Sequence, residues 1–222
     1  MPAVALRERL SSTIPGSMPE LLSFLSLDLQ ERDLDLSDPD HHTQLEPLLS
    51  ATDVIIVDNI STLTRGGREN EAESWLPVQE WALQQRRAGR SVVFVHHAGK
   101  GGQQRRTSRR EDVLDTVISL RKPADYRPEE GSRFELHYEK ARGFYGADAK
   151  PFEAAMREDG WSIRDINDVK MERVIELTIA KASVRDIADE LQISKTTVNR
   201  LQIRARELGK LPPVEEPKKA GT

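Results

Sequence analysis

The chain of 222 residues contains no cysteine, which excludes disulfide bonds and metal sites held by thiolates. No apolar run approaches the roughly 18–20 residues that a helix needs to span a bilayer. The N-terminus also lacks the charged-then-apolar pattern of a secretory signal peptide. These absences predict a cytoplasmic protein with no membrane partner.

A large charge of one sign is missing as well. The net charge is −4 and the pI near 5.8, so the chain as a whole has no electrostatic attraction to nucleic acid or membrane. The charge is unevenly distributed, however: residues 28–58 hold nine acids and one arginine, whereas residues 99–110 hold five Lys or Arg and no acid. A loop of that second kind repels itself, so it is either solvated surface or an anion-binding segment.

Two short apolar runs predict buried parallel strands. "DVIIVD" (53–58) and "SVVFV" (91–95) are continuous and β-branched, and a helix from Pro77 to about Gly89 lies between them. Strand, helix and strand in this order predict a right-handed crossover in an α/β layered sheet. We also expect helices over 2–10 and 39–50, the latter capped by Asp38, and an edge strand over 24–29.

Beyond the basic loop the pattern changes to short strands. We expect strands over 117–120, 134–139 and 152–156, then a hairpin at Asp159-Gly160 into 161–163, as an antiparallel flank of the same sheet. The predicted domains are an α/β core (1–164), a linker (165–169), an all-α domain (170–211) and a disordered tail (212–222).

The most specific local pattern is "SVRDIADELQISKTTVNRLQIRARELGKL" (183–211). Ile187, Ala188 and Leu191 share one helical face, and Ser194 can cap a second helix that follows a short turn. The stretch resembles the helix-turn-helix of resolvase-like and sigma-like DNA-binding domains. A small helical bundle for protein contacts is the alternative. The same helical pattern leaves four residues outward near the start of the second helix, as a DNA-recognition helix requires: Lys195, Thr196, Asn199 and Arg200.

The α/β core carries polar residues at the ends of its predicted strands. Asp58 ends the first buried strand, His97 follows the second, and Lys140-x-Arg142 ends a later one with both cations on one side. The alternatives are that Asp58 only caps the end of a strand and that Lys140 and Arg142 pair with local carboxylates. Adjacent residues on a strand point to opposite faces, which argues against a His96–His97 metal pair, and His41–His42 reads as solvated helix surface.

The stretches "VDNISTLTRGGRENEAESWLPVQEWALQQRRAG", "VVFVHHAGKGGQQRRTSRREDVLD" and "FELHYEKARGFYG" occur in the order found in one family. Over about residues 1–164 the chain resembles the RecA/KaiC-like ATPases, and specifically the plasmid RepA-type hexameric helicases. The resemblance implies ATP and Mg²⁺ as cofactors, a ring-shaped homo-oligomer, and a role in plasmid or phage DNA replication.

The resemblance also implies a role for each matching residue. Asp58 would hold Mg²⁺ through water as the Walker B acid, with Asn59 beside the nucleotide and His97 as the phosphate sensor. Lys140 and Arg142 would reach a neighbouring subunit's ATP. Four cations of the basic loop would face single-stranded DNA: Lys100, Arg105, Arg106 and Arg109.

One motif of that family is missing: no G-x-x-x-x-G-K-[ST] occurs anywhere in the chain. Without that loop nothing cradles the β and γ phosphates, and the strand with the family's catalytic Glu is missing too. We therefore expect Met1 to be an internal methionine of a longer ATPase. This chain alone should neither bind ATP tightly nor hydrolyse it. The alternative is a non-enzymatic helix-turn-helix regulator.

Overall fold

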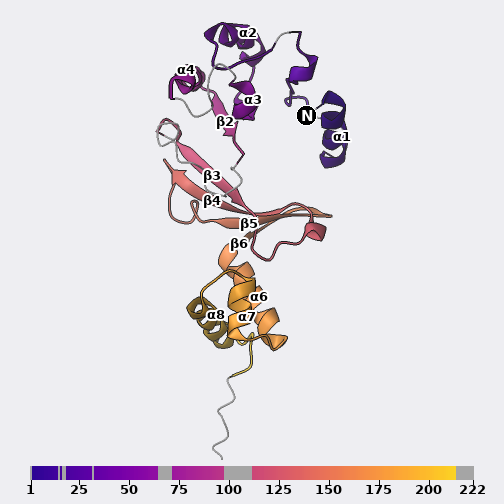
Figure 1. The fold of residues 1–222 in the computed structure, drawn as a ribbon, viewed down its shortest axis with the longest axis vertical. Coiled ribbons are helices and arrows are strands. Elements are labelled where there is room, and N and C mark those ends of the chain that lie inside the picture. The colour runs from indigo at the N-terminus through magenta and orange to yellow at the C-terminus, as the bar shows by residue number, and fades with distance from the viewer. Residues whose placement is uncertain are drawn as a thin grey trace, which may run out of the picture. The chain divides into compact units, whose positions relative to one another are not determined.

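The computed structural model describes residues 2–14, 16, 19–31, 33–64, 72–97 and 112–213. Within these residues the chain is a mixed α/β protein with one parallel and one antiparallel sheet (Figure 1). It divides into two compact units, Met1–Val113 and Leu114–Thr222, which are described separately below.

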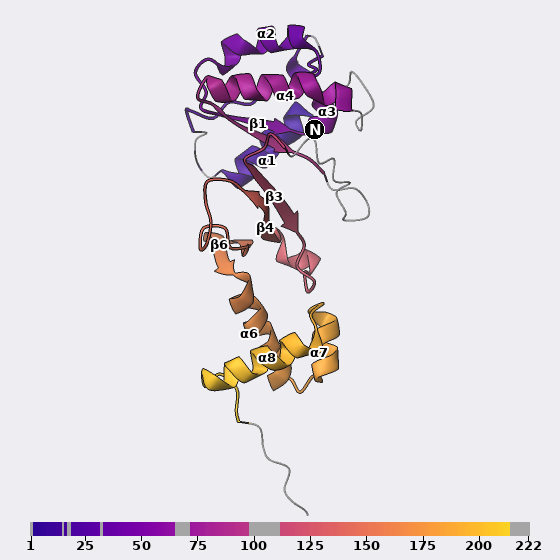
Figure 2. The same cartoon turned by 90° about the vertical axis from the view of Figure 1, so that its left-hand side faces the viewer.

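The first unit is built on two parallel strands, β1 (Val54–Asp58) and β2 (Ser91–Val95). Helix α4 (Ala72–Arg87) connects them and lies between the strands and helix α2 (Pro39–Leu49), as Figure 2 shows. The predicted strand–helix–strand order is therefore confirmed. The remaining elements are α1 (Ala3–Thr13), the 3₁₀ turn η1 (Leu27–Leu29) and the short helix α3 (Ile60–Leu63).

The core of this unit lies on one face of the strands. Val57 on β1 packs with Trp75, Val78 and Trp81, which recur along the inner side of α4. The side chain of Asp38 accepts a hydrogen bond from the Asp40 amide and caps α2, as the sequence predicts. The other core side chains are Leu36, Leu45 and Ile60.

Three sequence predictions in this unit are wrong. β1 was expected to be buried on both faces, but Ile56 is 64% exposed because the second face of the pair is uncovered by described residues. Residues 24–29 form no strand and end in the turn η1, since no neighbouring strand supplies hydrogen bonds. Pro77 lies inside α4 rather than at its start.

The predicted solvated position of the two histidines in α2 is also wrong. His41 and His42 are half-buried, and their ring nitrogens lie 3.0 Å from the Asp35 amide and 2.8 Å from the Leu36 carbonyl oxygen. They fold the preceding loop onto the helix. The ring of His42 also packs against that of Trp81, with centroids 6.0 Å apart.

The second unit begins with an antiparallel sheet in the order β3-β4-β5-β6. Its strands are Thr116–Arg121, Arg133–Ala141, Phe152–Arg157 and Gly160–Asp165, and the 3₁₀ turn η2 (Pro128–Glu130) precedes β4. All four predicted strands are confirmed, as is the hairpin at Asp159-Gly160, where Gly160 has φ +118°. They form a sheet of their own, however, hydrogen-bonded to neither β1 nor β2.

The two faces of this sheet differ in chemistry. One face carries aliphatic and aromatic side chains, and Ile118, Leu120, Trp161 and Ile163 are at least half exposed there. The opposite face carries charged residues such as Glu135 and Arg164 that pair with helix α6.

Three helices complete the second unit: α6 (Ile166–Ile179), α7 (Val184–Glu190) and α8 (Lys195–Glu207). The predicted linker, 165–169, is instead the last residue of β6 followed by the start of α6. Asp165 makes this direct passage possible because its side chain accepts the Asn167 amide at 2.7 Å and caps the helix. Residues 214–222 of the predicted tail lie outside the described residues.

Candidate nucleic-acid interface

The helices α6, α7 and α8 pack around a small apolar core (Figure 2). Val174, Ile187 and Val198, one from each helix, are fully buried where the three helices meet. Ala188 lies between them, and its single methyl group allows α7 and α8 to cross closely. A second cluster beside it consists of Met171, Ala205 and Leu211.

Side-chain caps define the turn between α7 and α8. Ser183 and Asp186 form a reciprocal capping box at the start of α7. Ser194 caps α8 by accepting the Thr197 amide at 3.1 Å, as its position in the sequence predicts. Gln192 reverses the chain between the helices with φ +50°, and the amide of the next residue returns to the Ala188 carbonyl at 3.0 Å. These contacts fix the start of α8.

Polar and basic side chains occupy the outer side of α8. Lys195, Thr196, Asn199 and Arg200 are all exposed, so the structure presents these four predicted residues together on the first turns of the helix. They recur at spacings of three and four residues and therefore share one face. The opposite face holds the buried Val198.

The charge of this face is positive. Helix α8 contains four cations and a single acid, Glu207, which pairs with Arg204 at 3.2 Å. Within the part of the chain that the structure describes, Lys195 and Arg200 form no ion pair. Their charges therefore remain available to an anionic ligand.

A buried glutamine holds α8 against α6. Gln202 is 8% exposed, and its amide Nε2 donates to the Thr178 hydroxyl at 2.9 Å. The Thr178 hydroxyl in turn donates to the Val174 carbonyl oxygen at 2.6 Å. Sequence analysis did not identify this hydrogen-bonded contact between α8 and α6. Its signal was the position of Gln202, which lies four residues after Val198 and three before Ala205, on the inner face of the helix.

A second unpredicted feature is a buried arginine on the polar face of the sheet. The side chain of Arg133 is 7% exposed and binds three carboxylates, Asp125 at 3.1 Å, Glu130 at 3.0 Å and Glu153 at 2.8 Å. Burial alone would lower the pKa of Arg133, but the hydrogen bonds to Glu153 and Glu130 raise it above its ordinary value. The guanidinium is thus permanently charged and organises β4, β5 and the loop before β4.

Arg173 extends this ionic network to the helices. Its guanidinium on α6 contacts Asp125 at 3.1 Å, Glu176 at 2.6 Å and Glu190 of α7 at 3.2 Å. The hydrogen bond to Glu176 raises the pKa of Arg173 most, followed by the charges around it. One side chain therefore connects the loop before β4 with both α6 and α7.

The residues predicted for nucleotide chemistry lie in both units. Asp58 ends β1 and is exposed, and His97 follows β2 on the same edge, since Asp58 is paired with Val95. The side chain of Asn59 is engaged as the cap of α3, accepting the Thr62 amide at 3.0 Å. The peptide bond between Asp58 and Asn59 is cis.

Lys140 and Arg142, the two predicted trans-acting cations, lie in the second unit. Lys140 is the penultimate residue of β4, and the exposed Arg142 follows the strand, with its amide bonded to the Asp115 carbonyl at 2.9 Å. The basic-loop residues Lys100, Arg105, Arg106 and Arg109 lie outside the described residues.

Carboxylates and histidines of the described residues form no cluster that could hold a metal ion. Asp58 could supply one water-mediated contact to Mg²⁺, but no group of three or more His, Asp or Glu among the described residues could hold a metal ion.

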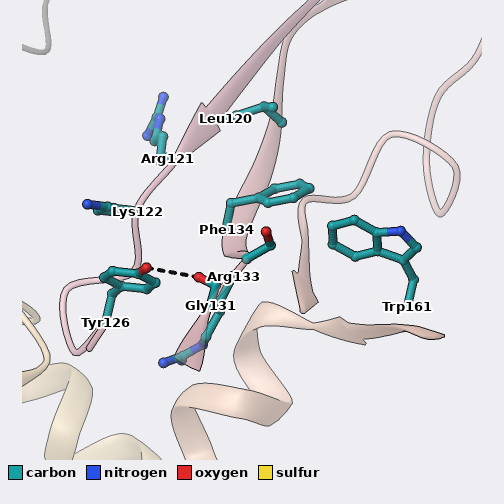
Figure 3. A pocket seen from close by; sticks show the side chains of 9 residues that line it. Leu120, Arg121, Lys122, Tyr126, Gly131, Arg133, Phe134 and Trp161 are labelled. Atoms are coloured by element: carbon teal, nitrogen blue, oxygen red, sulfur yellow. Dashed lines mark hydrogen bonds between the residues drawn. The ribbon is translucent and has the colours of Figure 1, made fainter. Parts of the chain in front are cut away.

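A shallow pocket of about 350 Å³ lies at one end of the antiparallel sheet (Figure 3). The rings of Phe134 and Trp161 meet edge to face on one side, with centroids 5.7 Å apart. Lys122 stacks over Tyr126 on the other side, 4.7 Å from the ring centroid. The lining residues are aromatic, aliphatic, cationic or small, and none of them is a carboxylate or a histidine.

Comparison with known proteins gave no match to any family model and none to the curated proteins. Within the described residues no helix is both long and apolar enough to cross a membrane.

Proposed function

We propose that α7 and α8 form a helix-turn-helix module and that the protein binds duplex DNA through the exposed face of α8. The observation that carries this proposal is the division of α8 into two sides. Val198 on the inner side is completely buried, while Lys195, Asn199 and Arg200 on the outer side are exposed.

The chemistry of the outer side matches a DNA major groove. Asn199 can bond in a bidentate manner to adenine, and Arg200 to guanine, whereas Lys195 at the start of the helix reaches a phosphate. The N-terminus of α8 also favours a phosphate, because backbone amides of the first turn point outward there and Lys195 adds a positive charge. The alternative is a helical bundle that contacts another protein. That alternative does not explain why Lys195 and Arg200, which form no ion pair with described residues, lie beside the amide side chain of Asn199.

The first test is fluorescence anisotropy with a labelled mixed-sequence duplex of about three helical turns, at several salt concentrations. Lys195→Ala should reduce the salt slope by about one and weaken binding to all sequences alike. On a preferred sequence, Arg200→Ala should cost about 1–3 kcal/mol.

Lys150→Ala serves as the matched control, because Lys150 is an exposed cation of the same unit outside the three helices. Its affinity and salt slope should equal those of the unmodified protein. If all three variants behaved alike, or if no duplex bound at low salt, the proposal would be wrong.

We propose, second, that about residues 1–164 belong to a RecA-like ATPase of the RepA-type helicase class, which acts on DNA as a ring. Two features support this: the resemblance in sequence, and the parallel pair that brings Asp58 and His97 to one edge. Because the phosphate-binding motif is absent from these 222 residues, this chain alone does not hydrolyse ATP.

Phosphate release from ATP and Mg²⁺, with and without single-stranded DNA, tests this second proposal. The 222-residue chain should release phosphate no faster than buffer. Turnover that Asp58→Ala abolishes would show instead that this chain is a complete ATPase with a phosphate site of another kind.

A further inference from the structure

Ile203 is an exposed aliphatic residue in an otherwise polar face of α8. Its exposed fraction is 57%, while Val198 and Ala205 on the same helix are completely buried. Ile203 lies four residues after Asn199 and three after Arg200, so helix geometry places the three side chains on one face. The exposed face of the proposed DNA-binding helix therefore carries a branched aliphatic side chain next to Asn199 and Arg200.

This position differs from that of the next exposed aliphatic residue along the chain, which lies at the C-terminal end of α8. Leu208, which follows the helix, is 47% exposed but lies roughly 140° around the helix axis from Ile203. The two side chains do not form a joint apolar patch. Ile203 is instead bordered by Arg200, which forms no ion pair with the described residues, and by Arg204, whose charge is paired with Glu207. The cation Arg200 beside an exposed aliphatic group suits an anionic surface with a local apolar group.

Among the groups that base pairs present in the major groove, the thymine C5 methyl is the apolar one. The rise of 1.5 Å per residue places Ile203 about 6 Å along the axis from Asn199, a distance of roughly two base pairs.

We propose that Ile203 is a specificity-determining residue that contacts the C5 methyl group of a thymine within about two base pairs of the base read by Asn199 or Arg200. This inference rests on the proposed function and adds the identity of one base and the group by which it is recognised.

The test replaces single methyl groups on the DNA. The full chain is first used to enrich a site from a randomised duplex library, and each thymine of that site is then replaced by deoxyuridine, which lacks only the methyl. At one thymine the replacement should weaken binding about fourfold, the factor expected for one buried methyl group. The same replacement should leave the affinity of Ile203→Ala unchanged.

Leu208→Ala is the matched control and should keep the full sensitivity to deoxyuridine. Unchanged melting of Ile203→Ala by circular dichroism would show that the exposed residue is not needed for folding. A selected site whose affinity no deoxyuridine alters, or an Ile203→Ala variant as sensitive as the unmodified protein, would overturn the inference alone. Duplex binding without any enriched sequence would also overturn it, and no duplex binding at all would overturn the proposed function as well.

Discussion

At the scale of single residues, the second unit depends on charged side chains in positions where a sheet usually carries apolar ones. Arg133 balances Asp125, Glu130 and Glu153 beneath β4 and β5. Because Arg133, Asp125 and Glu153 are largely shielded from water, removing one partner leaves the charges of the others under-compensated. Such residues give no periodic signal in the sequence, which explains why sequence analysis identified none of them.

Glu130 provides a pH-dependent test of this network. The Arg127 amide donates to its carboxylate at 3.0 Å, and this bond, with a contribution from Arg133, holds the pKa of Glu130 below its ordinary value of 4.5. A lowered pKa means that the folded state prefers the charged carboxylate. The resulting stability is present above the pKa of the unfolded chain and disappears as the pH falls through the lower, folded value.

We therefore expect Glu130→Gln to lower the free energy of unfolding by on the order of 1 kcal/mol at pH 7, and by progressively less below about pH 4.5. Urea unfolding followed by circular dichroism at several pH values measures the difference. Glu129→Gln is the control, because Glu129 is exposed and forms no ion pair with the residues that the structure describes. A loss that stays constant from pH 7 to pH 3 would contradict the role given to the charge.

At the scale of elements, substitutions of the residue that caps α8 can separate the stability of the helix from the proposed DNA binding. Ser194 caps the helix through its hydroxyl, so Ser194→Ala should destabilise the protein by about 1 kcal/mol. Ser194→Asp should keep the stability, since aspartate is an equally good cap and its charge favours the helix N-terminus. The same carboxylate should weaken duplex binding by repelling phosphate.

Thermal unfolding and anisotropy on the two variants measure these effects. If Ser194→Asp bound DNA as tightly as the unmodified chain, the start of α8 would not face the duplex. If both variants melted like the unmodified protein, the cap would contribute nothing.

The same scale shows what the sequence could predict. The strands β1 to β6 and the Ser194 cap were predicted because alternation, β-branched runs and capping residues are local signals. The edge strand over 24–29 was wrong, since its alternating pattern had no partner strand. The linker predicted over 165–169 was wrong because Asp165 is both the last residue of β6 and the cap of α6, so that no connecting segment is needed. Helical periodicity predicted the four outward residues of α8. The burial of Gln202 could not be predicted in this way, because it depends on the hydrogen bond to Thr178 on the neighbouring helix α6.

At the scale of the whole molecule, the division into two units allows the two proposed DNA-binding surfaces to be tested separately. A fragment of residues 114–213 contains the antiparallel sheet, the ionic network and all three helices, so it should unfold cooperatively by itself. It should bind duplex DNA with the affinity of the full chain, because the exposed face of α8 lies entirely within it.

The basic loop, residues 99–110, is missing from that fragment. If Lys100, Arg105, Arg106 and Arg109 face single-stranded DNA, the full chain should bind an oligothymidine strand with a steep salt dependence, and the fragment should not. Arg105→Ala combined with Arg109→Ala in the full chain should flatten that slope while leaving duplex binding unchanged. If the fragment, the full chain and the double variant instead bound the oligothymidine strand equally, the loop would be ordinary solvated surface. Helix α8 alone would then remain as the proposed DNA-binding surface.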